Sequence, residues 1–96
     1  MSEFLEQVVT ELNGRLEGGD VGGTAKFVME GEGAVVVDDS GARISDDAAD
    51  VTLTADADTF RAIFDGETNA TAAFMAGQLT VDGDMGLAMK LAAVLA

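Results

Sequence analysis

The feature that most constrains the fold is the apolar C-terminal stretch, residues 77–96. Apolar and polar side chains alternate through residues 78–82, and this alternation predicts a half-buried strand with Leu79 and Val81 on one face. The strand would therefore contribute one side to a buried core and leave its other side in contact with water.

A helix is predicted to follow this strand. Gly83 supplies the turn, and the Asp84 carboxylate can accept a hydrogen bond from a free backbone N–H group at the helix start. Lys90 is the only charge of the helix, and its large apolar residues lie nearly all round it: Met85, Leu87, Met89, Leu91, Val94 and Leu95. A helix that is apolar on every side must be covered on every side. In a chain of 96 residues the core covers one side, and a partner chain, a bound apolar ligand or a membrane must cover another.

The charge balance excludes some partners. The chain has 18 acidic and five basic residues, which give a formal net charge of −13. Nucleic acid is not an expected partner, because phosphate binding needs clustered Lys and Arg. The same deficit disfavours firm attachment to anionic membranes and leaves at most transient membrane contact. A hydrophobic content of 48% argues against disorder, so the acids must coat a folded surface. By association alone, such an acidic coat favours a salt-loving source.

Missing residue types narrow the chemistry further. The sequence has no Cys and no His, which removes disulfides, thiolates and the commonest general base and metal ligand. No apolar run reaches the ~20 residues that span a bilayer. Residues 1–6 carry acids where a signal peptide carries bases, so we expect a cytoplasmic protein.

Periodicity along the rest of the chain predicts an α+β fold. Residues 2–16 form the clearest amphipathic helix, with Ser2 as its N-cap and Gly14 as its weak point, since Gly costs roughly 1 kcal/mol against Ala inside a helix. Asp56 is expected to cap a later helix that ends at Gly66. Strands are predicted at 24–30, 34–37, 42–45 and 51–55, and a short helix at 70–76. Because strands come first and helices cluster later, the sheet should be mostly antiparallel.

One long block resembles a known family. It comprises Ala-Asp-Val-Thr-Leu-Thr-Ala-Asp at 49–56, Phe-Arg-Ala-Ile-Phe-Asp-Gly at 60–66 and Ala-Phe-Met-Ala-Gly-Gln-Leu-Thr-Val-Asp-Gly-Asp-Met-Gly-Leu-Ala-Met-Lys-Leu at 73–91. This block closely resembles the sterol carrier protein type-two family, the non-specific lipid-transfer domains. Its most specific part is the last, with Gly-x-Leu-x-Val, a Gly-Asp turn and Met-Gly-Leu-Ala-Met-Lys-Leu. Upstream of residue 49 the resemblance rests on the order of elements.

The resemblance implies a five-stranded, mostly antiparallel sheet covered by helices, in one sterol-carrier-like domain over residues 1–96. It also implies an apolar tunnel for a fatty acid, a sterol-like molecule or another lipid. The residues predicted to line this pocket come from the later helices and the last strand: Phe60, Phe64, Phe74, Met75, Leu79, Met85, Met89 and Leu91. Met suits ligands of varied shape, because its side chain is flexible and polarizable. The alternative for each Met is that it fills a small core.

Other clusters are interpreted as structural. The Asp-rich segments at 38–39, 46–50 and 56–58 do not match the EF-hand spacing, so we expect surface, turn and cap roles rather than a metal site. No Ser or Thr has a plausible base beside it, so the chain is predicted to be no enzyme and to need no cofactor. Lys90 could meet a lipid carboxylate at the pocket mouth, whereas most Lys side chains extend to the solvent.

Two hypotheses about function follow. The first is a small cytoplasmic protein that holds and transfers a lipid or fatty acyl ligand in a tunnel beneath the C-terminal helix, with ~0.8 kcal/mol for each buried CH₂ group. The second is an interaction module, in which that helix packs on a partner protein or on a second copy in a two-fold homodimer. A lipid-facing and a partner-facing helix share one pattern, so the sequence leaves both open.

Overall fold

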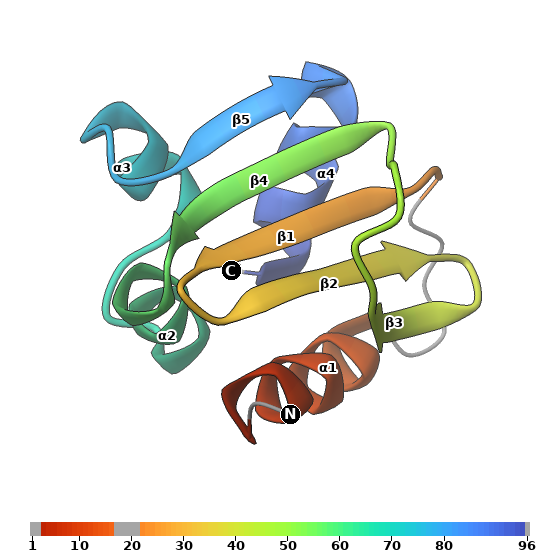
Figure 1. Cartoon of the computed structure of the whole chain (residues 1–96). Coiled ribbons are helices and arrows are strands. Elements are labelled where there is room, and N and C mark those ends of the chain that lie inside the picture. The colour runs from red at the N-terminus through yellow and green to blue at the C-terminus, as the bar shows by residue number, and fades with distance from the viewer. Residues whose placement is uncertain (1–2, 17–21, 96) are drawn as a thin grey trace.

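Five strands form one sheet in the computed structural model of the chain, which describes residues 3–16 and 22–95 (Figure 1). The strands are β1 (Ala25–Glu30), β2 (Gly33–Asp38), β3 (Gly41–Ile44), β4 (Val51–Asp56) and β5 (Thr80–Gly83), in the spatial order β3-β2-β1-β4-β5. The helices of the described part are α1 (Glu3–Leu16), α2 (Ala57–Asp65), α3 (Ala70–Met75) and α4 (Met85–Leu95). Three of the four strand pairings are antiparallel, which confirms the predicted α+β class and mostly antiparallel sheet.

The fourth pairing, between β1 and β4, is parallel. It arises because the connection at 45–50 crosses the outer face of the sheet in front of β2 and β1 before the chain enters β4 (Figure 1). The backbone N–H of Ser45 donates to the Ala34 carbonyl at 3.2 Å, and Lys26 Nζ lies 3.2 Å from the Asp46 carboxylate. These contacts hold the crossing segment against the strands beneath it.

The core lies between the sheet and the helices. In Figure 1, α4 passes behind β4 and β1, α1 lies below β2 and β3, α2 follows the left end of β4, and α3 lies beside the start of β5. Alternate side chains along a strand point to one face, and those of β1 and β4 that face the helices are buried: Ala25, Phe27, Met29, Val51, Leu53 and Ala55. The outer face carries no helix in the described part of the chain, so the helices cover the sheet on one side.

Helix α1 covers the β2–β3 end of this core. It buries its apolar side, formed by Phe4, Leu5, Val8 and Leu12, as its spacing predicts. Asn13 fixes the helix to β3: its side-chain oxygen accepts from the Ala42 N–H at 2.8 Å, and its amide donates to the Ala42 carbonyl at 3.4 Å. The predicted N-cap, Ser2, lies outside the described residues.

Helix α2 closes the middle of the core. The Asp56 carboxylate accepts from the Thr59 N–H at 2.7 Å, and Gly66 ends the helix in the left-handed conformation with φ of 82°, both as predicted. The Phe60 ring meets the Phe27 ring edge-on, with centroids 5.9 Å apart. Such aromatic pairs add stability beyond the area that they bury.

The last strand begins later than predicted. The expected strand over 78–82 is observed at Thr80–Gly83. The backbone N–H groups of Gln78 and Leu79 donate to the Ala73 carbonyl at 2.9 and 3.2 Å, so both residues close the end of α3 instead of pairing with β4. Leu79 nevertheless stays buried and Val81 half-buried, as the alternating pattern indicated.

Candidate functional site

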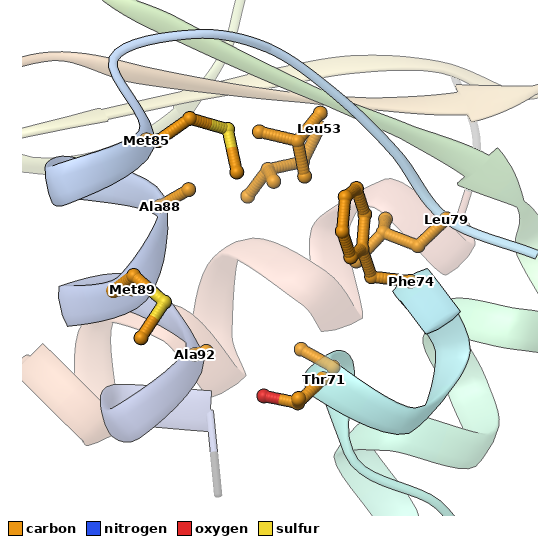
Figure 2. Close-up of a pocket in the computed structure, with 10 residues that line it drawn as sticks. Leu53, Thr71, Phe74, Leu79, Met85, Ala88, Met89 and Ala92 are labelled. Carbon is orange, nitrogen blue, oxygen red and sulfur yellow. The ribbon is translucent and has the colours of Figure 1, made fainter. Parts of the chain in front are cut away.

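An apolar pocket of about 90 Å³ lies between α3 and α4. Figure 2 shows α4 on one side, α3 on the other, and open space between their side chains. Its lining residues come from β4, α3, β5 with the residue before it, and α4: Leu53, Ala70, Thr71, Phe74, Leu79, Val81, Met85, Ala88, Met89 and Ala92. Thr71 has the only polar side chain among them. The pocket is therefore a site for apolar groups.

The floor of the pocket is a strand pair. Leu53 of β4 lies opposite Val81 of β5 in the antiparallel register, so both side chains project from the helix-covered face. Leu79 lies two residues before Val81 and reaches the same side. Strand pairing thus brings Leu53 and Val81 together beneath the helices, and Leu79 joins them from the turn that closes α3.

Helix α3 forms one wall. Asn69 begins it, and its side-chain oxygen accepts from the Ala72 N–H at 2.7 Å. Ala70 and Ala73 are buried, which directs Phe74 toward the pocket at 44% exposure. In Figure 2 the Thr71 hydroxyl oxygen points across the gap toward α4. The short helix therefore presents one aromatic ring and one hydroxyl to the pocket.

The start of α4 is fixed by Gly83 and Asp84. Gly83 has φ of 111°, and a Cβ there would collide with the Asp50 carbonyl oxygen, so the tight approach of β5 to Asp50 requires glycine. Asp84 caps the helix as predicted, because its carboxylate accepts from the Leu87 N–H at 3.1 Å. The first turn of α4 therefore has a defined position beside β4 and β5.

Helix α4 divides its apolar surface between the core and the pocket. Leu87, Ala88 and Leu91 are buried, whereas Met85 and Met89 keep 49% and 70% of their surface exposed. Both methionines line the pocket (Figure 2). Among residues 85–92 of α4, whose side chains the structure describes, Met85 and Met89 are therefore the large apolar residues that the core leaves uncovered. The predicted apolar residues Val94 and Leu95 lie outside the described side chains.

Comparison with known proteins places this fold in a family. A family model described as the SCP-2 sterol transfer family matches residues 5–96. The chain belongs to this family. The match confirms the resemblance seen in residues 49–91 and extends it upstream through α1 and the first three strands.

Two relatives and one solved structure illustrate the likeness. Human sterol carrier protein 2 is 36% identical over 98 residues, which cover 95% of this chain and 17% of that protein. Hydroxysteroid dehydrogenase-like protein 2 of Danio rerio is 48% identical over 48 residues, which cover 50% of this chain and 12% of that protein. The chain therefore spans less than a fifth of the length of either relative.

The structure of sterol carrier protein-2 from Aedes aegypti, solved as a complex with palmitate, has a TM-score of 0.80 against this chain. The two sequences are 31% identical, and the alignment covers 100% of this chain and 97% of that one. The SCP-2 fold is thus shared across the whole of the described molecule. No helix in residues 3–16 and 22–95 is long and apolar enough to cross a membrane.

The structure brings together half of the residues predicted for a lipid site. Phe74, Leu79, Met85 and Met89 line the pocket. The other four are not among its lining residues. Phe60 and Leu91 are buried in the core, Phe64 stacks on Phe60 with centroids 6.4 Å apart, and Met75 points outward at 81% exposure. The ligand-binding role of all eight stays a prediction.

The remaining lining residues were missed although a signal existed for most of them. Ala88 and Ala92 lie three and seven positions after Met85, which is one face of a helix. Ala70 and Thr71 precede Phe74 by four and three positions in the same way. Leu53 and Val81 required knowledge of which strands pair. The prediction contains only large side chains, whereas Ala70, Thr71, Ala88 and Ala92 are small.

The two carboxyl groups with lowered pKa values do not line the pocket. Hydrogen bonds from the Arg43 side chain and the Ser40 N–H lower the pKa of Asp38. Hydrogen bonds from the Thr59 hydroxyl and backbone N–H lower the pKa of Asp56. Both are structural carboxylates, at the end of β2 and at the start of α2. None of the described residues that line the pocket carries an acidic or basic side chain.

Proposed function

We propose that this chain binds a lipid in the pocket between α3 and α4 and carries it without catalysing a reaction on it. The observation that supports the proposal is the apolar pocket, found in a member of the SCP-2 sterol transfer family. The palmitate complex of the Aedes aegypti protein, aligned over the whole of this chain, supports a lipid as the kind of ligand.

The ligand enters the pocket by one end of an apolar chain. A cavity of about 90 Å³ is smaller than the roughly 150 Å³ cavity that accepts benzene, so a long lipid needs more room than the unliganded side chains leave. Met85 and Met89 can provide it, because their flexible side chains adopt several rotamers and both reach solvent. The binding energy then comes from burial, at ~0.8 kcal/mol for each CH₂ group.

Carriage without catalysis is supported by the side chains at the pocket. Activating a hydroxyl nucleophile requires a base within hydrogen-bond reach. Thr71 is the only described hydroxyl that lines the pocket, and no described titratable side chain lines it. The sequence also provides neither His nor Cys. The proposed role is therefore to keep an apolar molecule out of water and release it unchanged.

A titration with two fluorescent lipids, one a fatty acid and one without charge, tests the proposal. Each probe is added to the purified chain, and native mass spectrometry counts the bound molecules. We expect saturable binding of one lipid per chain for at least one probe. Absence of binding for both probes, together with no lipid extracted from the purified protein, overturns the proposal.

The alternative function is self-association through the same face. Phe74, Met75, Met85 and Met89 are exposed at 44–81%, and large apolar patches of this kind also mark protein interfaces. A two-fold homodimer would bury them against the same residues of a second copy. Sedimentation over a range of concentrations separates the two functions, because Met75→Lys would dissociate such a dimer, whereas this residue does not line the pocket.

A further inference from the structure

No Lys or Arg side chain lines the pocket, and all five of them lie in the described part of the chain. Arg15 and Arg61 stack over aromatic rings of α2 and α1, respectively. Lys26 and Arg43 form ion pairs with aspartates at 3.2 and 2.8 Å on the sheet. These four cationic side chains therefore make their contacts on other elements than α3 and α4.

The fifth cation, Lys90, is on α4 but faces away from the pocket. An α-helix turns 100° per residue, so Lys90 lies roughly 150° round the helix from the mean direction of the lining residues Met85, Met89 and their neighbours. Its Nζ lies beside Gly22, where an added Cβ would be 3.0 Å from it. Lys90 therefore does not meet a ligand headgroup at the pocket mouth.

At each of the two helix starts that frame the pocket, one backbone N–H already donates to a side chain of the protein. Ala72 N–H, in the first turn of α3, donates to the Asn69 side chain. Leu87 N–H, in the first turn of α4, donates to the Asp84 carboxylate. Backbone N–H groups at a helix start attract anions, and one at each start is thus taken, while the Asp84 carboxylate adds a negative charge beside α4. No Lys or Arg side chain lines the pocket to compensate the charge of an anionic headgroup.

From this arrangement we propose that the pocket selects a single-chain lipid whose polar end is uncharged, such as a long-chain alcohol or a monoacylglycerol, and that the Thr71 hydroxyl contacts that end. This inference rests on the proposed function of the pocket and narrows its ligand class. Thr71 is suited to the role, because a hydroxyl both donates and accepts hydrogen bonds and its oxygen points across the gap (Figure 2).

The net charge of the chain determines how strongly the pocket prefers a neutral ligand to an anionic one. Thirteen excess negative charges, taken at about 15 Å from the headgroup in water with a Debye length of about 10 Å, weaken carboxylate binding roughly fourfold at 0.1 M salt. At 1 M salt the Debye length is about 3 Å, and this penalty disappears. A neutral ligand of equal chain length is not repelled by the net charge at either salt concentration. The ratio of the affinities for the neutral and the anionic ligand therefore measures the contribution of the headgroup alone.

The test is displacement of an uncharged fluorescent probe by 1-dodecanol and by sodium dodecanoate at pH 8, in 0.1 M and 1 M sodium chloride. Dodecanol is expected to bind at least fourfold more tightly at 0.1 M, and the ratio should fall by roughly fourfold at 1 M. Dodecanoate binding as tightly as dodecanol at 0.1 M, or a ratio that does not change with salt, overturns the inference alone. If neither dodecanol nor dodecanoate displaces the probe, the proposed function is overturned as well.

Two charge variants provide a matched comparison on one helix. Thr71→Lys places a cation in the lining of the pocket, whereas Met75→Lys places the same charge on α3 at a residue that does not line it. Thr71→Lys should favour dodecanoate over dodecanol by about two- to fivefold relative to the wild type, as exposed ion pairs do. Met75→Lys should change the ratio only about 1.1-fold, its share of the whole-molecule charge effect. An equal change of the affinity ratio in the two variants would contradict the placement of the headgroup at Thr71.

Thr71→Val tests the hydroxyl itself, since Val has nearly the same shape. Loss of one hydrogen bond should weaken dodecanol binding by about two- to tenfold. The affinity for dodecane, which has no polar end, should stay the same and serves as the control. Unchanged dodecanol affinity in this variant would overturn the assignment of Thr71.

Discussion

Met89 is the residue that most directly separates a binding pocket from a packed core. It lines the pocket and is 70% exposed, so a larger side chain there meets open space. We predict that Met89→Trp lowers lipid affinity about tenfold or more while the free energy of unfolding changes by less than about 0.5 kcal/mol. Leu91→Trp, on the buried side of α4, should instead destabilise by ~1–3 kcal/mol, because it overpacks the core.

Met75→Trp is the control for Met89→Trp, since Met75 is exposed but does not line the pocket. Lipid titrations and thermal melts of the three variants give both quantities. Loss of stability in Met89→Trp with unchanged lipid affinity would show that this side chain belongs to the packing of the fold and not to the ligand site.

Asp56 makes the free energy of unfolding depend on pH in the acidic range. Hydrogen bonds from Thr59 lower its pKa below the ordinary value of 3.8 in the folded state. A lowered folded pKa means that the stabilisation is fully present above pH 3.8 and is lost as the pH falls from there through the folded pKa. Asp56→Asn keeps a capping oxygen but cannot titrate. The excess stability of the wild type over this variant should therefore be present near pH 6 and shrink below 3.8 in melting curves. A difference that is constant with pH would contradict this role of Asp56.

At the scale of single elements, Gly14 lowers the stability of α1, and a substitution can restore it. Gly14 lies in the exposed interior of the helix, and an added Cβ there would have no atom within 4 Å outside its own helix. Gly14→Ala is predicted to raise the free energy of unfolding by ~0.5–1 kcal/mol, because Ala has the higher helix propensity. Gly66→Ala is the matched control. Its φ of 82° is strained for any residue with a Cβ, so the same substitution should lower stability. Urea unfolding of both variants tests this, and a destabilising Gly14→Ala would contradict it.

The elements themselves were largely predictable because their signals are local. The caps at Asp56 and Asp84 and the stop at Gly66 are each fixed by a hydrogen bond or a backbone angle within a few residues. The predicted start of β5 was wrong, because two sets of backbone hydrogen bonds compete for residues 78 and 79 and the apolar pattern does not show which set forms. Gln78 and Leu79 alternate like strand residues, but their N–H groups complete the end of α3.

The candidate site was only half predictable, also for a physical reason. An apolar side chain on a helix face satisfies the same pattern whether it meets another element or a gap. Phe60 and Leu91 meet the sheet and the other helices, whereas Phe74 and Met89 meet the space between α3 and α4. Which of these occurs depends on strand pairing far apart in the sequence, including the parallel pairing of β1 with β4.

For the whole molecule, the dominant long-range force is the repulsion among its acids. The net charge of −13 lies within extents of 31 × 30 × 23 Å, comparable to the Debye length of about 30 Å at 0.01 M salt. Screening at 1 M removes most of this repulsion, which otherwise favours the expanded chain. Exposed ion pairs such as Arg61 with Asp58 contribute little, so screening them costs little. The melting midpoint should therefore rise through a sodium chloride series, and a flat or falling midpoint would show that the acidic coat does not limit stability.

The central claim is that the space between α3 and α4 receives a lipid chain, and the measurement that tests it most directly is a crystal structure with 12-bromododecan-1-ol. The anomalous signal of bromine locates the end of the chain independently of any model of the ligand. The account predicts a bromine peak in the pocket between Leu79 and Met89, with the alcohol end near Thr71. A bromine peak elsewhere, or a second copy of the chain packed over the same face with no bromine in the pocket, would contradict it.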